Sequence, residues 1–172
     1  MISKTMEKLL NEQINKELYS ANLYLSMCSY FKDLELDGFA NFYRIQSKEE
    51  LFHASKQFDY MHDVGGKVTM MAVDAPETKF KSIIHVFQLT LEHEKTVTSS
   101  INNLVNQALS ESDFATHNFL QWFIAEQVEE EASISNLLKK LEMIGDNSSA
   151  MYLLNAELGQ RTYKEKSAGS NN

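Results

Sequence analysis

The chain has few residues that break helices or cross-link chains: its 172 residues include one cysteine, one proline and six glycines. The single cysteine, Cys28, cannot form an internal disulfide, and this fits a reducing compartment. No linker rich in Ser and Gly occurs before the last few residues, so the length favours one domain with a sizeable core. We expect that domain to span residues 1–160 and a disordered polar tail to follow at residues 161–172.

Three further absences restrict the partners of the protein. The formal net charge is −8, whereas binding to nucleic acid depends on clustered Lys and Arg. No uninterrupted apolar run approaches the roughly 20 residues of a membrane span. The N-terminal segment lacks the basic and then apolar pattern of a signal peptide. We therefore expect a cytoplasmic protein that binds neither nucleic acid nor a membrane.

Core-type residues recur along the chain in alternating steps of three and four, which is typical of helices packed in a bundle. The first segment with this spacing contains Leu10, Ile14, Ala21, Tyr24 and Cys28; the third contains Ile84, Phe87, Leu91, Ile101 and Val105; the fourth contains Leu120, Phe123, Ile134, Leu137, Leu141 and Ile144. The second segment, roughly residues 38–64, is amphipathic but less regular. Turn residues at 33–38 and 110–113 separate the members of each pair, so two helical hairpins are predicted.

The two predicted hairpins are joined by about a dozen residues, from Val64 to Pro76. Extended at about 3.3 Å per residue, this segment reaches roughly 40 Å. A helix of about 27 residues has a similar length at a rise of about 1.5 Å per residue. We therefore expect an all-α, ferritin-like four-helix bundle with one long crossover connection, the arrangement that holds dinuclear carboxylate sites. A short fifth helix is expected after Gly145, at about residues 150–158.

Six residues with metal-ligand chemistry occur at matched places on the predicted helices: Glu17, Glu50, His53, Glu94, Gln127 and Glu130. Glu50 follows Glu17 by 33 residues (50 − 17), and His53 lies three residues further on. The spacing recurs in the second hairpin, where Gln127 follows Glu94 by 33 residues (127 − 94) and Glu130 lies three further on. Solvent-facing acids have no reason to repeat one spacing, so the pattern predicts a site shared between the hairpins.

Burial of these glutamates requires a compensating charge. An isolated ionised carboxylate in an apolar core costs several kcal/mol, and clustered carboxylates repel one another. No Lys or Arg occupies a core-type position near the six residues, so divalent cations are the remaining candidates. A mixed set of oxygen and imidazole ligands suits iron, manganese or zinc better than magnesium or calcium. Two metals that share a bridging carboxylate would place positive charge where the acids converge.

Over about residues 1–160, these residues and their spacing resemble the bacterial non-haem ferritins. The resemblance implies that one iron is held by Glu17, Glu50 and His53. It implies that a second iron is held by the bridging Glu50 with Glu94 and Glu130, and that Gln127 lies beside it. A third, weaker iron site is implied by the match of Glu49, Glu126, Glu129 and the shared Glu130. The aromatic residues for which the family has a proposed role in electron donation match Tyr24 and Trp122.

The resemblance also implies an activity, that of an iron-storage ferroxidase. Fe(II) would be oxidised to Fe(III) at the dinuclear centre with O2 or H2O2 as acceptor, and ferric mineral would be deposited in a hollow shell of 24 identical subunits. The fifth helix would meet its copies around the fourfold axes. No haem is expected, because the haem-binding branch has Glu-x-x-His on both the second and the fourth helix and a methionine at the position of Phe52.

Other interpretations stay open from the residues alone. A di-iron peroxidase or oxidase of the rubrerythrin type is disfavoured, because the chain has no Cys-x-x-Cys pair. A non-catalytic helical scaffold is a third class. A DNA-protecting mini-ferritin is disfavoured because it lacks this full intrachain ligand set, and this chain has no basic tail. Without the resemblance, the acids between residues 126 and 131 are better explained as a solvated face, and Tyr24 is equally a core residue.

Overall fold

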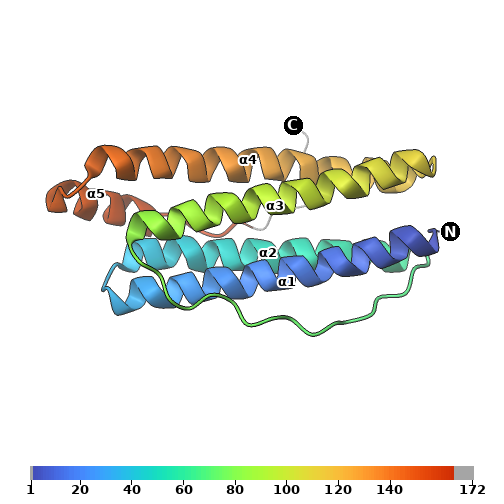
Figure 1. Cartoon of the computed structure of the whole chain (residues 1–172), viewed down its shortest axis with the longest axis horizontal. Helices are drawn as coiled ribbons and strands as arrows, with labels where there is room; N and C mark the ends of the chain where they lie inside the picture. The colour runs from blue at the N-terminus through green and yellow to red at the C-terminus, as the bar shows by residue number, and fades with distance from the viewer. Residues whose placement is uncertain (1, 165–172) are drawn as a thin grey trace.

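A computed structural model describes residues 2–164, which form five helices and no strand. In chain order these are α1 (Lys4–Asp33), α2 (Asp37–Asp63), α3 (Ile83–Ser110), α4 (Phe114–Ile144) and α5 (Ser148–Gly159). Figure 1 shows α1 to α4 side by side along the long axis, with α5 at one end. This arrangement confirms the predicted four-helix bundle with a short fifth helix. None of the described helices is both long and apolar enough to cross a bilayer.

The helix ends are set by short polar side chains and tight turns. Four of the five helices begin at a side chain that accepts a hydrogen bond from the backbone N–H three residues further on, namely Ser3, Ser82, Asp113 and Asn147. α2 has no such cap, because Leu36 precedes it. Each hairpin turn contains one non-glycine residue with left-handed backbone, Glu35 (φ 58°) and Ser112 (φ 55°). These turns make the two helices of each hairpin antiparallel.

The crossover between α2 and α3 comprises residues 64–82, several residues more than the sequence predicted. It contains no helix or strand and ends at Ser82, whose side chain accepts a hydrogen bond from the first turn of α3. Figure 1 shows it running along the bundle beside α1. Asn11 on α1 holds it there, because its Nδ2 donates to Lys67 O (2.9 Å) and its Oδ1 accepts from Thr69 N (2.7 Å). The crossover therefore lets α2 and α3 run in the same direction.

The apolar core consists of two separate clusters rather than one. The first includes Tyr24, Phe31, Phe39, Tyr43, Phe87, Ile134 and Leu141, and lies toward the α1–α2 turn and α5. The second includes Met6, Leu10, Met61, Ile101, Leu120 and Phe123, and lies toward the α3–α4 turn. On every long helix, the predicted metal ligands lie between the residues of the first cluster and those of the second. A polar layer therefore divides the core.

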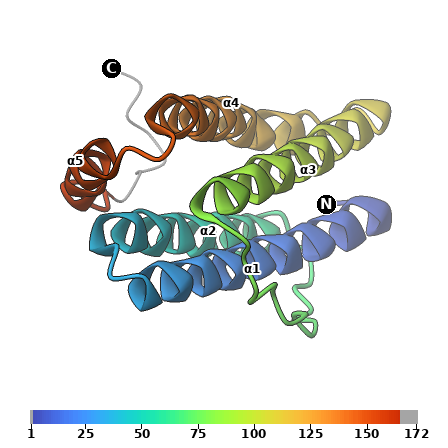
Figure 2. The same cartoon turned by 60° about the vertical axis from the view of Figure 1, so that its left-hand side comes forward.

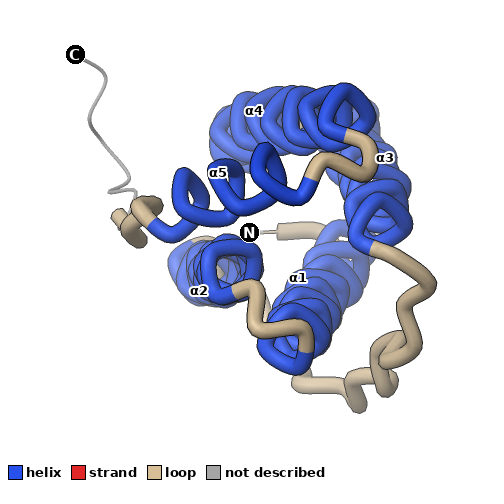
Figure 3. The backbone as a smooth tube through the Cα atoms, turned by 90° about the vertical axis from the view of Figure 1, so that its left-hand side faces the viewer, coloured by secondary structure: helices blue, strands red, loops and turns tan. Residues whose placement is uncertain are grey.

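α5 packs against the start of α2 in its own chain (Figures 2 and 3). Asn155 Oδ1 accepts hydrogen bonds from the backbone N–H groups of Gly38 (2.9 Å) and Phe39 (3.2 Å), so α5 supplies the cap that α2 lacks. In return, Asn41 Nδ2 donates to Leu158 O near the end of α5 (3.1 Å). Only glycine permits this approach, because a Cβ at position 38 would lie 1.6 Å from the Asn155 carbonyl oxygen.

The apolar residues of α5 are shared between an inner and an outer face. Leu154 and Leu158 are buried within the chain, whereas Tyr152 and Leu153 are 73% and 68% exposed. Leu154 and Leu158 belong to the first core cluster, so they pack within the chain. The exposed outer face leaves apolar surface for the copies that the sequence predicts α5 to meet, and that contact stays a prediction. Most of the predicted disordered tail, at residues 165–172, lies outside the described residues.

Replacement of Gly38 by alanine is expected to detach α5 from α2, because the added methyl group cannot share space with the Asn155 carbonyl. We expect a loss of roughly 2–3 kcal/mol of stability. Asn155→Ala, which removes only the cap, should cost about 1 kcal/mol. Thermal melting and limited proteolysis between α4 and α5 measure both effects. A Gly38→Ala protein as stable and as protease-resistant as the parent would contradict the close approach.

Candidate metal centre

The polar layer receives side chains from all four long helices. α1 provides Glu17, α2 provides Glu50 and His53, α3 provides Glu94, and α4 provides Gln127 and Glu130. All six are buried, with 1% to 5% of their surface exposed. The register predicted from the sequence therefore puts them in one layer.

Three of the six converge closely enough to share one metal ion. Ligand atoms of Glu17, Glu50 and His53 lie within 4.8 Å of one another. His53 Nδ1 lies 3.4 Å from Glu50 Oε2. Among the described residues, this is the one group of three or more His, Cys, Asp or Glu that meets this spacing. Glu94 and Glu130 lie outside the group.

The second half of the layer is linked by hydrogen bonds from neutral donors. Gln127 Nε2 donates to Glu94 Oε2 (3.0 Å), and the Tyr24 hydroxyl donates to Glu94 Oε1. Gln46 Nε2 donates to Glu130 Oε2 (2.8 Å). These donors orient the carboxylates but carry no positive charge. They therefore do not compensate the negative charge of the acids.

Glu17 is positioned by two glutamines that sequence reasoning did not assign to the site. Gln13 Nε2 and Gln57 Nε2 both donate to Glu17 Oε1, at 3.0 and 2.9 Å. Glu17 Oε2 is buried and accepts no hydrogen bond from any described residue. An orphaned carboxylate oxygen beside Glu50 and His53 is the environment that a cation would complete. Gln46 and Gln57 occur at core-type positions of the second helix. That spacing is the feature of the sequence that could have indicated their place in the polar layer.

Tyr24 and Trp122 both contact the polar layer. Tyr24 is fully buried, bonds to Glu94, and lies edge-on to His93 with ring centroids 5.9 Å apart. Burial, and next the charge of Glu94, hold the pKa of the Tyr24 hydroxyl well above its usual range. Trp122 lies edge-on to His53 with ring centroids 5.5 Å apart, and Lys56 Nζ lies 4.7 Å from the Trp122 ring centroid.

The residues of the expected third site lie around α2 and α4 but do not converge. Glu49 and Glu126 are buried, Glu130 also belongs to the polar layer, and Glu129 is exposed. Glu126 Oε2 lies 4.0 Å from His53 Nε2. Glu49 Oε2 instead accepts a hydrogen bond from Arg161 (2.7 Å). Glu49 and Glu126 are buried, whereas the acids of a wholly solvated face would be exposed.

Burial also changes the proton affinity of the clustered acids. Desolvation, reinforced by the charges of Glu94, Glu17 and Glu130, raises the pKa of Glu50 well above its ordinary value of 4.5. Desolvation, and next the charge of Glu130, raises the pKa of Glu94 to about 7. In the metal-free protein, protons therefore supply part of the charge that a cation would supply.

This proton uptake predicts the pH dependence of the metal-free protein. Between about pH 4.5 and 7 the folded state binds protons that the unfolded state releases, so stability falls as the pH rises through this window. Glu50→Gln removes one titrating group and should melt above the parent at pH 8, with a smaller difference at pH 5. Thermal melts in chelator measure this, and exposed Glu92→Gln is the control. If the melting temperatures of the parent and Glu50→Gln changed with pH in parallel, proton uptake at Glu50 would not be the cause of the pH dependence.

A four-helix bundle that buries Glu and His side chains from its helices between two apolar clusters defines a ferritin-like protein of the dinuclear-carboxylate class. The family model for the ferritin-like domain matches residues 7–144. The chain is 46% identical over 153 residues to the bacterial non-haem ferritin of Campylobacter jejuni, which covers 89% of this chain and 92% of that one. Identity to the bacterial non-haem ferritin of Staphylococcus aureus is 42% over 166 residues, or 96% and 100% of the two chains.

Solved structures agree with these relatives. An engineered closed form of the Archaeoglobus fulgidus ferritin superposes with a TM-score of 0.94 at 48% identity, covering 95% of this chain and 100% of that chain. An open-pore ferritin from the same archaeon gives a TM-score of 0.93 at 49% identity, covering 94% and 99%. The chain belongs to the ferritin family. Its function is iron storage with ferroxidase activity, and the Glu17, Glu50 and His53 cluster fits a di-iron site.

Proposed function

We propose that the polar layer is a dinuclear iron centre at which this ferritin oxidises Fe(II). Glu17 and His53 hold one iron, Glu94 and Glu130 hold the other, and Glu50 bridges them. Gln127 lies beside the second iron and bonds to Glu94. The convergence of Glu17, Glu50 and His53, with one Glu17 oxygen left unpartnered, is the observation that carries the proposal.

Iron is the substrate of this centre, and the chain's own groups define how it binds. Two Fe(II) ions give up two electrons, which reduce O2 with two protons to H2O2, or H2O2 with two protons to water. Among the described residues, no Lys or Arg forms an ion pair with Glu17, Glu50 or Glu94. The carboxylates therefore favour the higher charge of Fe(III), which drives oxidation. Tyr24, which bonds to Glu94, and Trp122, which lies beside His53, would donate further electrons.

Three further features belong to the same proposal. Glu49, Glu126 and Glu129, with the shared Glu130, form a weaker third iron site that iron occupies in passing. The subunit forms a hollow shell of 24 copies in the cytoplasm, where Fe(III) mineralises. No haem takes part, because Phe52 stands before His53 and packs near Trp122 with ring centroids 5.9 Å apart.

Glu50→Ala is expected to abolish rapid Fe(II) oxidation, because it removes the bridge and leaves both iron positions with incomplete ligand sets. Purified parent and variant would receive two Fe(II) per subunit in air, with ferric absorbance followed at early times. Loss of the bridge should lower the initial rate at least roughly a hundredfold, which corresponds to about 2.7 kcal/mol of barrier.

Glu92→Ala is the matched control for this experiment. Glu92 lies on α3 two residues before Glu94, and it is exposed. The Glu92→Ala variant should therefore retain the parent's initial rate of Fe(II) oxidation. Equal rates for Glu50→Ala and the parent would rule out Glu50 as the bridging ligand.

The outer face of α5 is expected to stabilise the shell. Tyr152 and Leu153 are exposed in the single chain, and burial of apolar surface between copies contributes about 25 cal/mol per Å2. Leu153→Glu should therefore reduce the assembled fraction in light scattering or native mass measurement. Ser149→Glu adds the same charge at an exposed polar position of α5 and should assemble like the parent. If Leu153→Glu formed intact shells, the outer face of α5 would not contribute to assembly.

A further inference from the structure

The segment that follows α5 brings a positive charge to the expected third iron site. Arg161 Nη2 donates to Glu49 Oε2 at 2.7 Å, across 112 residues of sequence. The same guanidinium donates from Nη1 to Gln46 Oε1 at 2.5 Å. Gln46 Nε2 in turn donates to Glu130 Oε2 at 2.8 Å. Arg161 therefore acts on two of the four third-site acids, on Glu49 directly and on Glu130 through Gln46.

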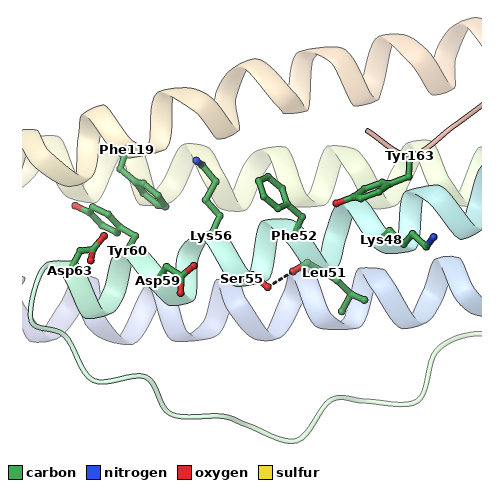
Figure 4. Close-up of a pocket in the computed structure, with 10 residues that line it drawn as sticks. All are labelled: Lys48, Leu51, Phe52, Ser55, Lys56, Asp59, Tyr60, Asp63, Phe119 and Tyr163. Carbon is green, nitrogen blue, oxygen red and sulfur yellow. Dashed lines mark hydrogen bonds between the residues drawn. The ribbon is translucent and has the colours of Figure 1, made fainter. Parts of the chain in front are cut away.

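This arginine is held in place by more than its ion pair. Its backbone oxygen accepts from Asn41 Nδ2 (2.9 Å), and its guanidinium lies over the ring of buried Phe42, 4.8 Å from the centroid. Two residues further on, Tyr163 lies beside Lys48, whose Nζ is 5.7 Å from its ring centroid (Figure 4). The backbone and side chain of Arg161 and the ring of Tyr163 thus all contact residues of α2. The segment after α5 therefore packs against α2.

The hydrogen bonds fix which way Gln46 faces. Its amide can donate to Glu130 only if its oxygen faces Arg161, and the guanidinium has donors but no acceptor. Arg161 thus keeps the Gln46 amide group turned toward Glu130. Its planar fork holds donors toward Glu49 and Gln46 in a fixed geometry, which the rotatable donors of an ammonium group do not provide.

We propose that Arg161 is a displaceable counter-ion that weakens iron binding at the third site, so that iron there must replace the guanidinium as the partner of Glu49. The inference rests on the proposed function, because it assumes that Glu49 and Glu130 ligate iron. The structure supports it in a specific way: the third-site acids do not converge while Glu49 is bonded to Arg161.

Competition between a guanidinium and a metal ion gives the third site a distinct character. Among the described residues, Glu17 and Glu94 accept hydrogen bonds from glutamine amides and the Tyr24 hydroxyl, whereas Glu49 accepts one from a permanently charged group. A cation that must displace another cation binds more weakly and leaves more readily. The side chain of Arg161 is 30% exposed, so solvent screening limits but does not remove this competition.

The test is calorimetric titration of the assembled protein with Fe(II) in the absence of any oxidant, so that binding is measured without turnover. Arg161→Gln should retain two tight binding events per subunit and tighten the third roughly tenfold, which corresponds to about 1.4 kcal/mol. Lys140→Gln is the matched control. It removes an equally positive side chain that pairs with Glu157 on α5, away from Glu49.

Glu49→Gln separates the proposed cause from a general change of charge. In Arg161→Gln with Glu49→Gln, the gain from the arginine replacement should disappear, because the acid for which iron and arginine compete is gone. Arg161→Lys is the second variant, for use if Arg161→Gln does not assemble. It keeps the charge but loses the fork, so the third event should tighten by a smaller factor.

The outcomes separate this inference from the proposed function. A third event that is unchanged or weaker in Arg161→Gln and Arg161→Lys overturns the inference, as does a gain that survives Glu49→Gln or appears equally in Lys140→Gln. With two tight events intact, that failure leaves the dinuclear assignment standing. Absence of two tight events in the parent would instead overturn the dinuclear assignment and this inference with it.

Discussion

The constraint on which this structure depends is the cost of placing several carboxylates inside a helical bundle. Neutral donors such as Gln13, Gln57 and Tyr24 hold two of these acids in position, but a neutral donor cannot cancel a charge. Only protons or cations can do so. A bundle that is held rigid by an apolar cluster on each side therefore keeps a site whose electrostatic demand is met by metal.

The charge that surrounds the carboxylates of α2 differs from one residue to the next. Burial, and next the charges of Glu94, Glu17 and Glu130, raise the pKa of Glu50, and no Lys or Arg among the described residues forms an ion pair with it. One residue earlier in the chain, Glu49 accepts a charged hydrogen bond from Arg161. Neighbouring glutamates on α2 therefore differ in whether a cationic side chain compensates their charge. The proposed dinuclear centre and the proposed third site would therefore differ in how strongly they bind iron.

The sequence predicted the layer better than it predicted its surroundings. Two residues at similar distances before and after a tight turn lie side by side in a helical hairpin. The 33-residue separation of Glu17 and Glu50 across the turn was therefore enough to predict that they lie together. The start of α3 was less predictable, because an extended crossover has no periodicity and ends at a cap, Ser82. The pair of Arg161 with Glu49 had no local signal, since it depends on the path of α5 across the bundle end. The metal-ligand roles themselves stay predictions.

The close contact between Gly38 and Asn155 also has a consequence for the order of folding. These residues are 117 positions apart, whereas each hairpin joins helices that are neighbours in sequence. Contacts between sequence neighbours form early because little loop entropy is lost, and distant ones form late. Docking of α5 is thus expected to be the last step in completing a subunit. Since the outer face of α5 is exposed at that same end, neighbouring copies would meet a finished α5 only on chains that have already folded.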